Sequence, residues 1–129
     1  MSTLDKNKSV CRAFLTHIGR RQFDDALALV HDNVVWWLQG DFARSGFREG
    51  KDTLFTNLAQ VLATDLELEF GHLTAEEDRV AVEMESRGKL ANGKDYRNSY
   101  HYLFFVKDGK IRECHEYLDT KHLAEVMFD

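Results

Sequence analysis

Apolar residues in the first half of the chain recur every three or four positions, which is the period of an amphipathic helix. One stripe contains Val10, Phe14 and Ile18, and the sequence Gly19-Arg20-Arg21 after it predicts the end of that helix. Residues 23–30 and 54–62 repeat this spacing in two shorter segments. Between them, the β-branched and aromatic run 34–38 predicts a strand, and the glycine-rich, polar stretch 40–50 predicts a loop.

After Asp65 the apolar period changes to two, which is typical of strands with one buried face. This alternation predicts strands near residues 66–70, 80–85, 96–106 and 111–118. Because short turns join these strands, we expect an antiparallel meander covered by helices on one face. A curved sheet over helices leaves a cavity between the two layers, and such a cavity is the default ligand site.

Short polar signals mark the turns between these elements. Asn92-Gly93 predicts a hairpin because both residues tolerate a positive φ, and Asp108-Gly109 predicts a second one. A short C-terminal helix follows, with either Asp119 or Thr120 as its cap.

The composition is that of one globular domain over residues 1–129, with 43% hydrophobic and 30% charged residues. The net charge is −5 and the basic residues are scattered, so no electrostatic footprint for nucleic acid is present. No apolar run approaches the roughly 20 residues that a membrane span needs, and residues 1–10 lack the apolar core of a signal peptide. We therefore expect a cytoplasmic protein without nucleic-acid or membrane partners.

The cysteines and histidines form no reactive or metal-binding motif. Cys11 and Cys114 are expected to be buried free thiols, because a disulfide is unusual in a reducing compartment and neither residue has a neighbour that would lower the thiol pKa. The histidines are dispersed, and no pair has metal-ligand spacing with an acidic third partner. Without a phosphate loop or a nucleophile elbow, we expect no metal and no cofactor.

Several short segments follow one another in a recognisable order over roughly residues 8 to 127. They are Phe23-Asp24-Asp25-Ala26-Leu27, Asp32-Asn33-Val34-Val35-Trp36 leading to Gly40, Gly50-Lys51, Asn92-Gly93-Lys94-Asp95-Tyr96, Asn98-Ser99-Tyr100, Asp108-Gly109-Lys110-Ile111 and Glu116-Tyr117-Leu118-Asp119. In this order and spacing the chain resembles the ketosteroid-isomerase-like superfamily, also called nuclear transport factor 2-like, and above all its SnoaL-like branch. The resemblance implies an α+β fold in which a cone-shaped, curved antiparallel sheet wraps over three N-terminal helices, with a short C-terminal helix.

The resemblance implies the fold better than the activity, because this fold hosts isomerases, cyclases, epoxide hydrolases, dehydratases, binding modules and transport factors. Its members hold their site in a deep, mostly apolar cone closed by the helices. The catalytic positions of the ketosteroid isomerases fall near Trp37, near Leu15, and near His101 or Tyr102, and none of their catalytic residues is preserved. Steroid isomerisation by that mechanism is therefore not expected.

The resemblance to limonene-epoxide hydrolases implies a different set of residues. Their acid–arginine–acid set falls on Glu85, Glu83 and Glu116, so a glutamate replaces the central arginine. Arg87 lies two residues further on and on the same strand face, where it could partly substitute. The sequence is compatible with epoxide hydrolysis without favouring it.

The period of two places Glu83, Glu85 and Arg87 on one strand face. The period alone makes this a solvated face, because charged residues are almost never buried unless they are paired. The resemblance instead points this face into the cone and leaves the apolar face of residues 80–84 for a homodimer interface. The prediction that follows from the resemblance is a polar site inside the cone.

Carboxylates that meet inside such a cone cannot all stay ionised, so at least one pKa rises and the group becomes a general acid or base. A nearby tyrosine and asparagine would orient a water molecule or a substrate carbonyl. The alternative left open is that Arg87 or Arg97 neutralises the acids in static ion pairs. The candidate catalytic residues are Glu85, Glu116, Glu83, Tyr100 and Asn98.

Trp36 and Trp37 point to opposite sides of their strand, and we expect Trp36 to line the cavity. For Trp36 and for the helix residues that would close the cone, core packing remains the alternative. The candidate pocket residues are Trp36, Phe14, Leu15, Leu58, Leu62, Arg87, Tyr102 and Leu118.

The sequence therefore predicts a pocket for a small, largely apolar molecule. One function for it is that of a cofactor-independent lyase, isomerase or hydrolase that works by acid–base chemistry. The other is non-catalytic small-molecule binding by an accessory protein of the same fold. A pure interaction domain is disfavoured because the second half of the chain is strongly charged. The expected partners are a small apolar molecule and a second copy of the chain, bound through the sheet.

Overall fold

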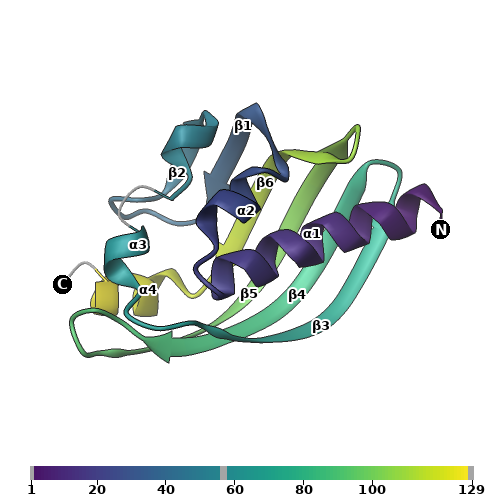
Figure 1. Ribbon diagram of the computed structural model, residues 1–129. Coiled ribbons are helices and arrows are strands. Elements are labelled where there is room, and N and C mark those ends of the chain that lie inside the picture. Colours follow the sequence, from purple (N-terminus) through teal and green to yellow (C-terminus); the bar gives the residue numbers. More distant parts are fainter. Residues whose placement is uncertain (1, 56–57, 128–129) are drawn as a thin grey trace.

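Six strands form one curved sheet, and a long N-terminal helix lies across one face of it (Figure 1). The computed structural model describes residues 2–55 and 58–127. The helices are α1 (Thr3–Gly19), α2 (Phe23–Leu27), α3 (Leu58–Val61) and α4 (Thr120–Met127), with a single 3-10 turn η1 (Lys51–Thr53). The strands are β1 (Val30–Leu38), β2 (Gly46–Glu49), β3 (Glu67–Glu76), β4 (Arg79–Lys89), β5 (Asp95–Lys107) and β6 (Lys110–Leu118). This arrangement confirms the expected α+β fold.

The strand order in the sheet is β2-β1-β6-β5-β4-β3. Strands β3 to β6 form the predicted antiparallel meander. Strand β1 adds to it in parallel with β6, with Trp36 opposite Cys114, so the sheet is mixed. The β5–β6 hairpin turns at Asp108 and Gly109, whose φ angles of 52° and 78° are those of the tight turn predicted there.

Helix α1 is capped by Ser2, whose Oγ accepts a hydrogen bond from the Asp5 N–H at 3.1 Å. Its buried face includes Cys11 and Phe14, both 0% exposed. The helix ends at Gly19, where an added Cβ would lie only 3.0 Å from the Leu68 side chain. Glycine at this position therefore lets the end of α1 pack closely on β3.

Two apolar clusters fill the space between the sheet and the helices. The larger one joins α1 to the middle of the sheet and contains both Cys11 and Cys114, which are unpaired and fully buried, as predicted. The smaller one contains Leu62, Leu90 and Leu123 and joins α4 to the region around α3. The candidate site lies where these two clusters meet.

Three predicted elements differ from the structure. The stretch 40–50 is not only a loop, because residues 46–49 form β2 against β1. The second helix ends at Leu27 and Val30 already belongs to β1, where it pairs with Ile111 of β6. The third helix is a single turn, α3, preceded by η1, and part of its predicted range (56–57) lies outside the described residues.

The cap of the last helix is Asp119, whose Oδ1 accepts a hydrogen bond from the His122 N–H at 3.1 Å. This hydrogen bond settles the choice between Asp119 and Thr120. Within residues 2–55 and 58–127, no helix has the length and apolar character to cross a membrane.

Candidate functional site

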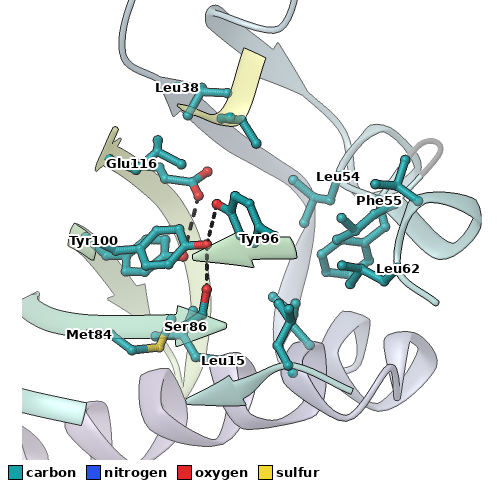
Figure 2. Close-up of a pocket in the computed structure, with 18 of the residues that line it drawn as sticks. Leu15, Leu38, Leu54, Phe55, Leu62, Met84, Ser86, Tyr96, Tyr100 and Glu116 are labelled. Atoms are coloured by element: carbon teal, nitrogen blue, oxygen red, sulfur yellow. Dashed lines mark hydrogen bonds between the residues drawn. The ribbon is translucent and has the colours of Figure 1, made fainter. Parts of the chain in front are cut away.

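A mostly apolar cavity of about 170 Å³ lies between the inner face of the sheet, the end of α1, and the helices α3 and α4 (Figure 2). An engineered apolar cavity of roughly 150 Å³ is enough to bind benzene, so this one has room for a ring-sized group. Its apolar wall includes Leu38, Leu54, Phe55 and Met84. Of the residues predicted for the site, the cavity wall contains Leu15, Trp36, Leu58, Leu62, Tyr100, Tyr102, Glu116 and Leu118.

Glu116 is the acidic residue of this wall, and two neutral donors hold its carboxyl group. Trp36 Nε1 donates to Oε1 at 2.9 Å, and the Tyr102 hydroxyl donates to Oε2 at 3.4 Å. The sheet register produces this meeting, since Tyr102 is directly opposite Glu116 and Trp36 lies on the neighbouring parallel strand. Opposite residues share one face of a sheet, so all three side chains point inward.

Burial raises the pKa of the Glu116 carboxyl above its ordinary value of 4.5. The hydrogen bond from Trp36, the positive charge of Arg48 and the hydrogen bond from Tyr102 act in the opposite direction, because each favours the ionised form. A carboxyl group with a raised pKa exchanges its proton closer to neutral pH than an exposed one does. Such a group can act as a general acid or a general base.

Three hydroxyl groups form a chain beside this carboxyl group (Figure 2). The Tyr100 hydroxyl is hydrogen-bonded to Tyr96 at 2.7 Å and to Ser86 at 2.9 Å. Burial raises the pKa of all three tyrosines of the cavity wall, including Tyr102, above the ordinary value of 10.0. They therefore remain protonated at neutral pH and can donate hydrogen bonds to a ligand oxygen.

The prediction that Glu83, Glu85 and Arg87 point into the cone is wrong. Strand β4 places Glu83 opposite His101 and Glu85 opposite Ser99, on the outer face of the sheet, where all of these residues are exposed. Their contacts are on that face as well. Glu83 pairs with His72 at 3.0 Å, Glu85 accepts a hydrogen bond from Ser99 at 3.2 Å, and Arg87 pairs with Glu67 at 3.0 Å.

The apolar even-numbered face of β4 packs inward instead. Val80 and Val82 are 0% exposed within the single chain, so this face cannot serve as the expected dimer interface. The strand period alone predicted the solvated face correctly, and the position-by-position comparison with the epoxide hydrolases reversed it. The acid–arginine–acid arrangement of those enzymes is therefore not assembled in this cavity.

Two further candidates lie near the cavity in other roles. The Asn98 amide donates to the Asp119 carbonyl at 3.0 Å and accepts from the Asp119 N–H at 2.8 Å, so it fastens β5 to the start of α4. Phe14 is fully buried behind the wall, with its ring centroid 5.8 Å from that of Trp36 and 6.2 Å from that of Phe55. Both residues are absent from the cavity wall.

Several wall residues were not predicted from the sequence. Tyr96 and Ser86 share the strand period of Tyr100 and Met84, so the alternation in residues 80–106 contained a signal for them. Arg44 and Arg48 were missed because residues 40–50 were taken for a loop. In the described parts of the chain, no three His, Cys, Asp or Glu side chains are grouped so that they could hold a metal ion.

Comparison with known proteins agrees with this fold. The family description "SnoaL-like domain" matches residues 11–114. No curated protein matches the sequence.

Solved structures share the whole fold. TerC, co-crystallised with polyporic acid, has a TM-score of 0.78 at 20% identity over 96% of this chain and 99% of its own. A Bacillus subtilis protein described as an isomerase has a TM-score of 0.81 at 20% identity over 98% and 95%. A protein from Jannaschia sp. CCS1 described as a SnoaL-like polyketide cyclase has a TM-score of 0.77 at 17% identity over 98% and 95%. Because the family match spans most of the chain and these structures share its fold, the protein belongs to the SnoaL-like branch of the nuclear transport factor 2-like superfamily.

Proposed function

We propose that the protein is a cofactor-independent enzyme that moves a proton on a small, largely apolar substrate, with Glu116 as the acid–base group. The observation that carries this proposal is a carboxyl group, held by Trp36 and Tyr102, inside an apolar, ring-sized cavity, where burial raises its pKa. Proton abstraction next to a carbonyl group suits this site best, because it needs one base and one donor to the carbonyl oxygen. An isomerase or a lyase uses this step.

The hydroxyl chain supplies the second part of this chemistry. The Tyr100 hydroxyl, held by Tyr96 and Ser86, is a fixed donor for an oxygen that gains negative charge. Glu116 would take the proton from the adjacent carbon and return it elsewhere on the substrate, so that the protein carries no net charge change over a cycle. The names of the structural neighbours, an isomerase and a polyketide cyclase, fit this reaction class.

The experiment is hydrogen–deuterium exchange of small enolisable ketones, followed by NMR in D₂O. We would use 2-tetralone, 1-indanone and cyclohex-2-enone, and compare the wild type with Glu116→Gln. Glutamine keeps the size of the side chain and cannot accept a proton, so we expect exchange to slow by roughly 100-fold or more. The matched control is Glu85→Gln on the outer face, which should exchange these protons at the wild-type rate.

Two results would contradict the proposal. One is an exchange rate that Glu116→Gln leaves unchanged. The other is wild-type exchange that stays at the buffer rate for every ketone while the ketones are bound, which thermal stabilisation of the protein reports independently.

The second candidate function, non-catalytic binding, has an observation of its own. Both oxygens of Glu116 already accept hydrogen bonds, from Trp36 and Tyr102, as they would in a carboxyl group with a purely structural role. A ligand that stabilises the wild type and Glu116→Gln equally, without any proton exchange, would favour this binding function.

We also propose a homodimer formed through the outer face of the sheet. On that face Phe47 is 70% exposed and lies against Trp37, with ring centroids 6.4 Å apart, and Tyr117 lies 5.2 Å on the other side of Trp37. Exposed aromatic groups of this kind are typical of interfaces. Sedimentation should give twice the chain mass of 15.0 kDa, and Phe47→Glu should give the single-chain mass. A wild-type protein that sediments only as a single chain would refute the dimer.

The location that we propose is the cytoplasm. Cys11 and Cys114 are buried and unpaired, and unpaired thiols are usual in reducing compartments. Thiol labelling of freshly isolated, unfolded protein checks this. Two reactive thiols per chain are expected, and a recovered disulfide would argue against it.

A further inference from the structure

Two arginines face the apolar cavity beside Glu116. Arg48 on β2 is directly opposite Trp36 on β1, so both side chains point to the same side of the sheet. The preceding residue, Phe47, points to the outer face and is 70% exposed. Arg44, in the segment that leads into β2, also contributes to the cavity wall.

Among the residues that the structure describes, neither arginine forms an ion pair. Within residues 2–55 and 58–127, no ion pair closer than 4.0 Å involves Arg44 or Arg48. In that part of the chain, Arg48 Nε is buried and makes no hydrogen bond. A buried donor without a hydrogen-bond partner lowers the stability of the folded protein, so Arg48 is unfavourable for folding as long as no ligand is bound.

The surroundings of Arg48 also disfavour its charge. Burial lowers the pKa of Arg48, and the like charge of Arg44 lowers it further, while the charge of Glu116 raises it. Glu116 is therefore near enough to act on Arg48 through its field. Its two oxygens, however, accept their hydrogen bonds from Trp36 and Tyr102.

The charges of the cavity wall do not balance. In the described residues, the side chains of this wall that carry charge at neutral pH are Arg44, Arg48 and Glu116, so two positive charges face at most one negative charge. The chain as a whole has a net charge of −5, so this local excess is opposite in sign to that of the protein. One anionic group, placed within reach of both guanidinium groups, would complete the site.

We propose that the cavity binds a carboxylic acid with an apolar, ring-sized body, and that Arg44 and Arg48 hold its carboxylate. The inference deepens the proposed function, on which it rests, by naming the class of ligand that enters the same cavity. The flat guanidinium group binds a carboxylate through two parallel hydrogen bonds. The apolar body then lies against wall residues such as Leu54, Phe55 and Leu62, and Glu116 faces the part of the ligand next to the carboxylate.

The experiment compares each acid with its neutral amide of nearly the same shape. The probes are benzoate with benzamide, cinnamate with cinnamamide, and 2-naphthoate with 2-naphthamide. Affinity is measured at pH 7 and low salt by isothermal titration calorimetry, on the full chain. The variants are Arg48→Gln and Arg44→Gln, and the matched control is Arg97→Gln, which removes an exposed arginine that is not part of this wall.

At least one acid should bind the wild type roughly tenfold or more tightly than its amide, because the amide lacks the charge that a guanidinium–carboxylate pair needs. Arg48→Gln should weaken binding of that acid by a similar factor and leave the affinity for the amide within about twofold. Arg97→Gln should leave both affinities unchanged. Thermal unfolding shows whether each variant is folded, and Arg44→Gln provides an independent second test.

The proposal is overturned if no acid binds more tightly than its amide, or if the preference for the acid survives in both Arg48→Gln and Arg44→Gln. The two proposals for this cavity can fail separately. Loss of the acid preference in the arginine variants, together with unchanged proton exchange in Glu116→Gln, would support the ligand class and refute the catalytic role. The opposite pair of results would keep the catalytic role and refute the ligand class.

Discussion

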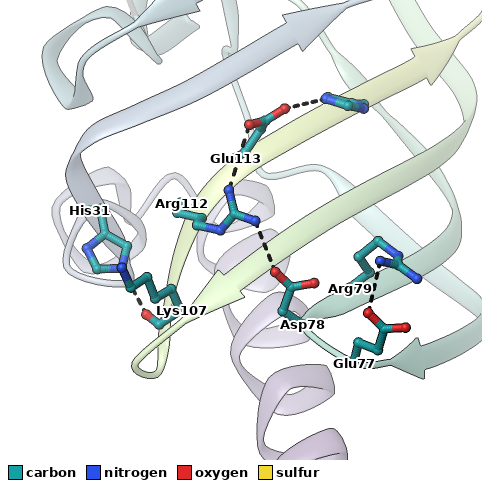
Figure 3. A network of polar contacts seen from close by, with 8 residues as sticks. His31, Glu77, Asp78, Arg79, Lys107, Arg112 and Glu113 are labelled. Carbon is teal, nitrogen blue, oxygen red and sulfur yellow. Dashed lines mark hydrogen bonds and ion pairs between the residues drawn. The ribbon is translucent and has the colours of Figure 1, made fainter.

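The charged groups of the cavity and those at the opposite end of the sheet have contrasting surroundings. At the β3–β4 turn and the start of β6, the charges form a connected network (Figure 3). Arg112 pairs with Asp78 at 3.0 Å and with Glu113 at 4.0 Å, and Glu113 is 2.6 Å from His115. In the cavity, Arg48 Nε has no partner among the described residues, and Glu116 is held by neutral donors.

The two groups of charges differ in their effect on the stability of the fold. Ion pairs near a protein surface contribute roughly 0–1 kcal/mol each, so this partly exposed network adds little to the stability of the fold. A charge in an apolar cavity lowers stability unless it is paired. Packing alone would favour apolar side chains of the same size, so the presence of Arg48 and Glu116 there supports the ligand that we propose for this cavity.

The largest effect that would sharpen this comparison is expected for Trp36→Phe. This change removes the N–H that holds Glu116 and leaves a gap in the wall, so the free energy of unfolding at pH 8 should fall by about 2–4 kcal/mol. Trp37→Phe, on the outer face of the same strand, should cost less than about 1 kcal/mol. Urea unfolding of both variants measures the difference, and equal losses would contradict the assignment of the two faces.

The next effect is a pH dependence that Glu116→Gln should remove. Because folding raises the pKa of Glu116, the stability linked to this group is fully present below its ordinary pKa of 4.5 and is lost as the pH rises through the raised value. The stability of Glu116→Gln relative to the wild type should therefore increase with pH above 4.5, by at most about 1.4 kcal/mol per pH unit. Urea unfolding between pH 4.5 and 8, with Glu85→Gln as the exposed control, measures this. A stability difference that decreases with pH would show that the pKa of Glu116 is lowered instead.

The smallest effect is expected when Arg48, which has an unpaired donor in the cavity, and Arg112, which belongs to the ion-pair network, are each replaced by methionine. Arg48→Met removes an unpaired donor from the cavity and should raise the unfolding free energy by about 1 kcal/mol. Arg112→Met breaks a partly exposed ion-pair network and should lower the unfolding free energy by at most about 1 kcal/mol, less so at high salt. Thermal unfolding at low and high salt gives both values. If Arg48→Met were the more destabilising variant, an internal partner of Arg48 would have to exist.

Much of the fold could be predicted because local signals and the tertiary structure agree. The alternation in residues 66–118 and the Asp108-Gly109 turn predicted the meander. A period of two indicates a strand and two residues that tolerate a positive φ indicate a tight turn, and both signals are local. Helix α1 followed from the stripe that contains Phe14. Strand β2 was not predicted because its four residues, Gly46–Glu49, are too few to show an alternating pattern. Their conformation is decided by pairing with β1.

The candidate site divides in the same way. Glu116, Tyr100 and Trp36 were named from the sequence, and the structure brings all three to one cavity. The resemblance to a family did not correctly predict whether the charged face of β4 points into the cavity or to solvent. A shift of one residue in the alignment of a strand is enough to exchange its two faces. The cross-strand register, with Met84 opposite Tyr100, decides it.

The sequence by itself determined the number and kind of most elements, which residues of the strands β3 to β6 share a face, and the net negative charge of the chain. These are properties of neighbouring residues, and short-range sterics and hydrophobic period are enough to define them. Only the tertiary structure decided which inward residues meet. Glu116 comes together with Trp36 and Arg48 across three strands, and the low dielectric between the sheet and the helices turns their proximity into a raised carboxyl pKa and an unpaired guanidinium group.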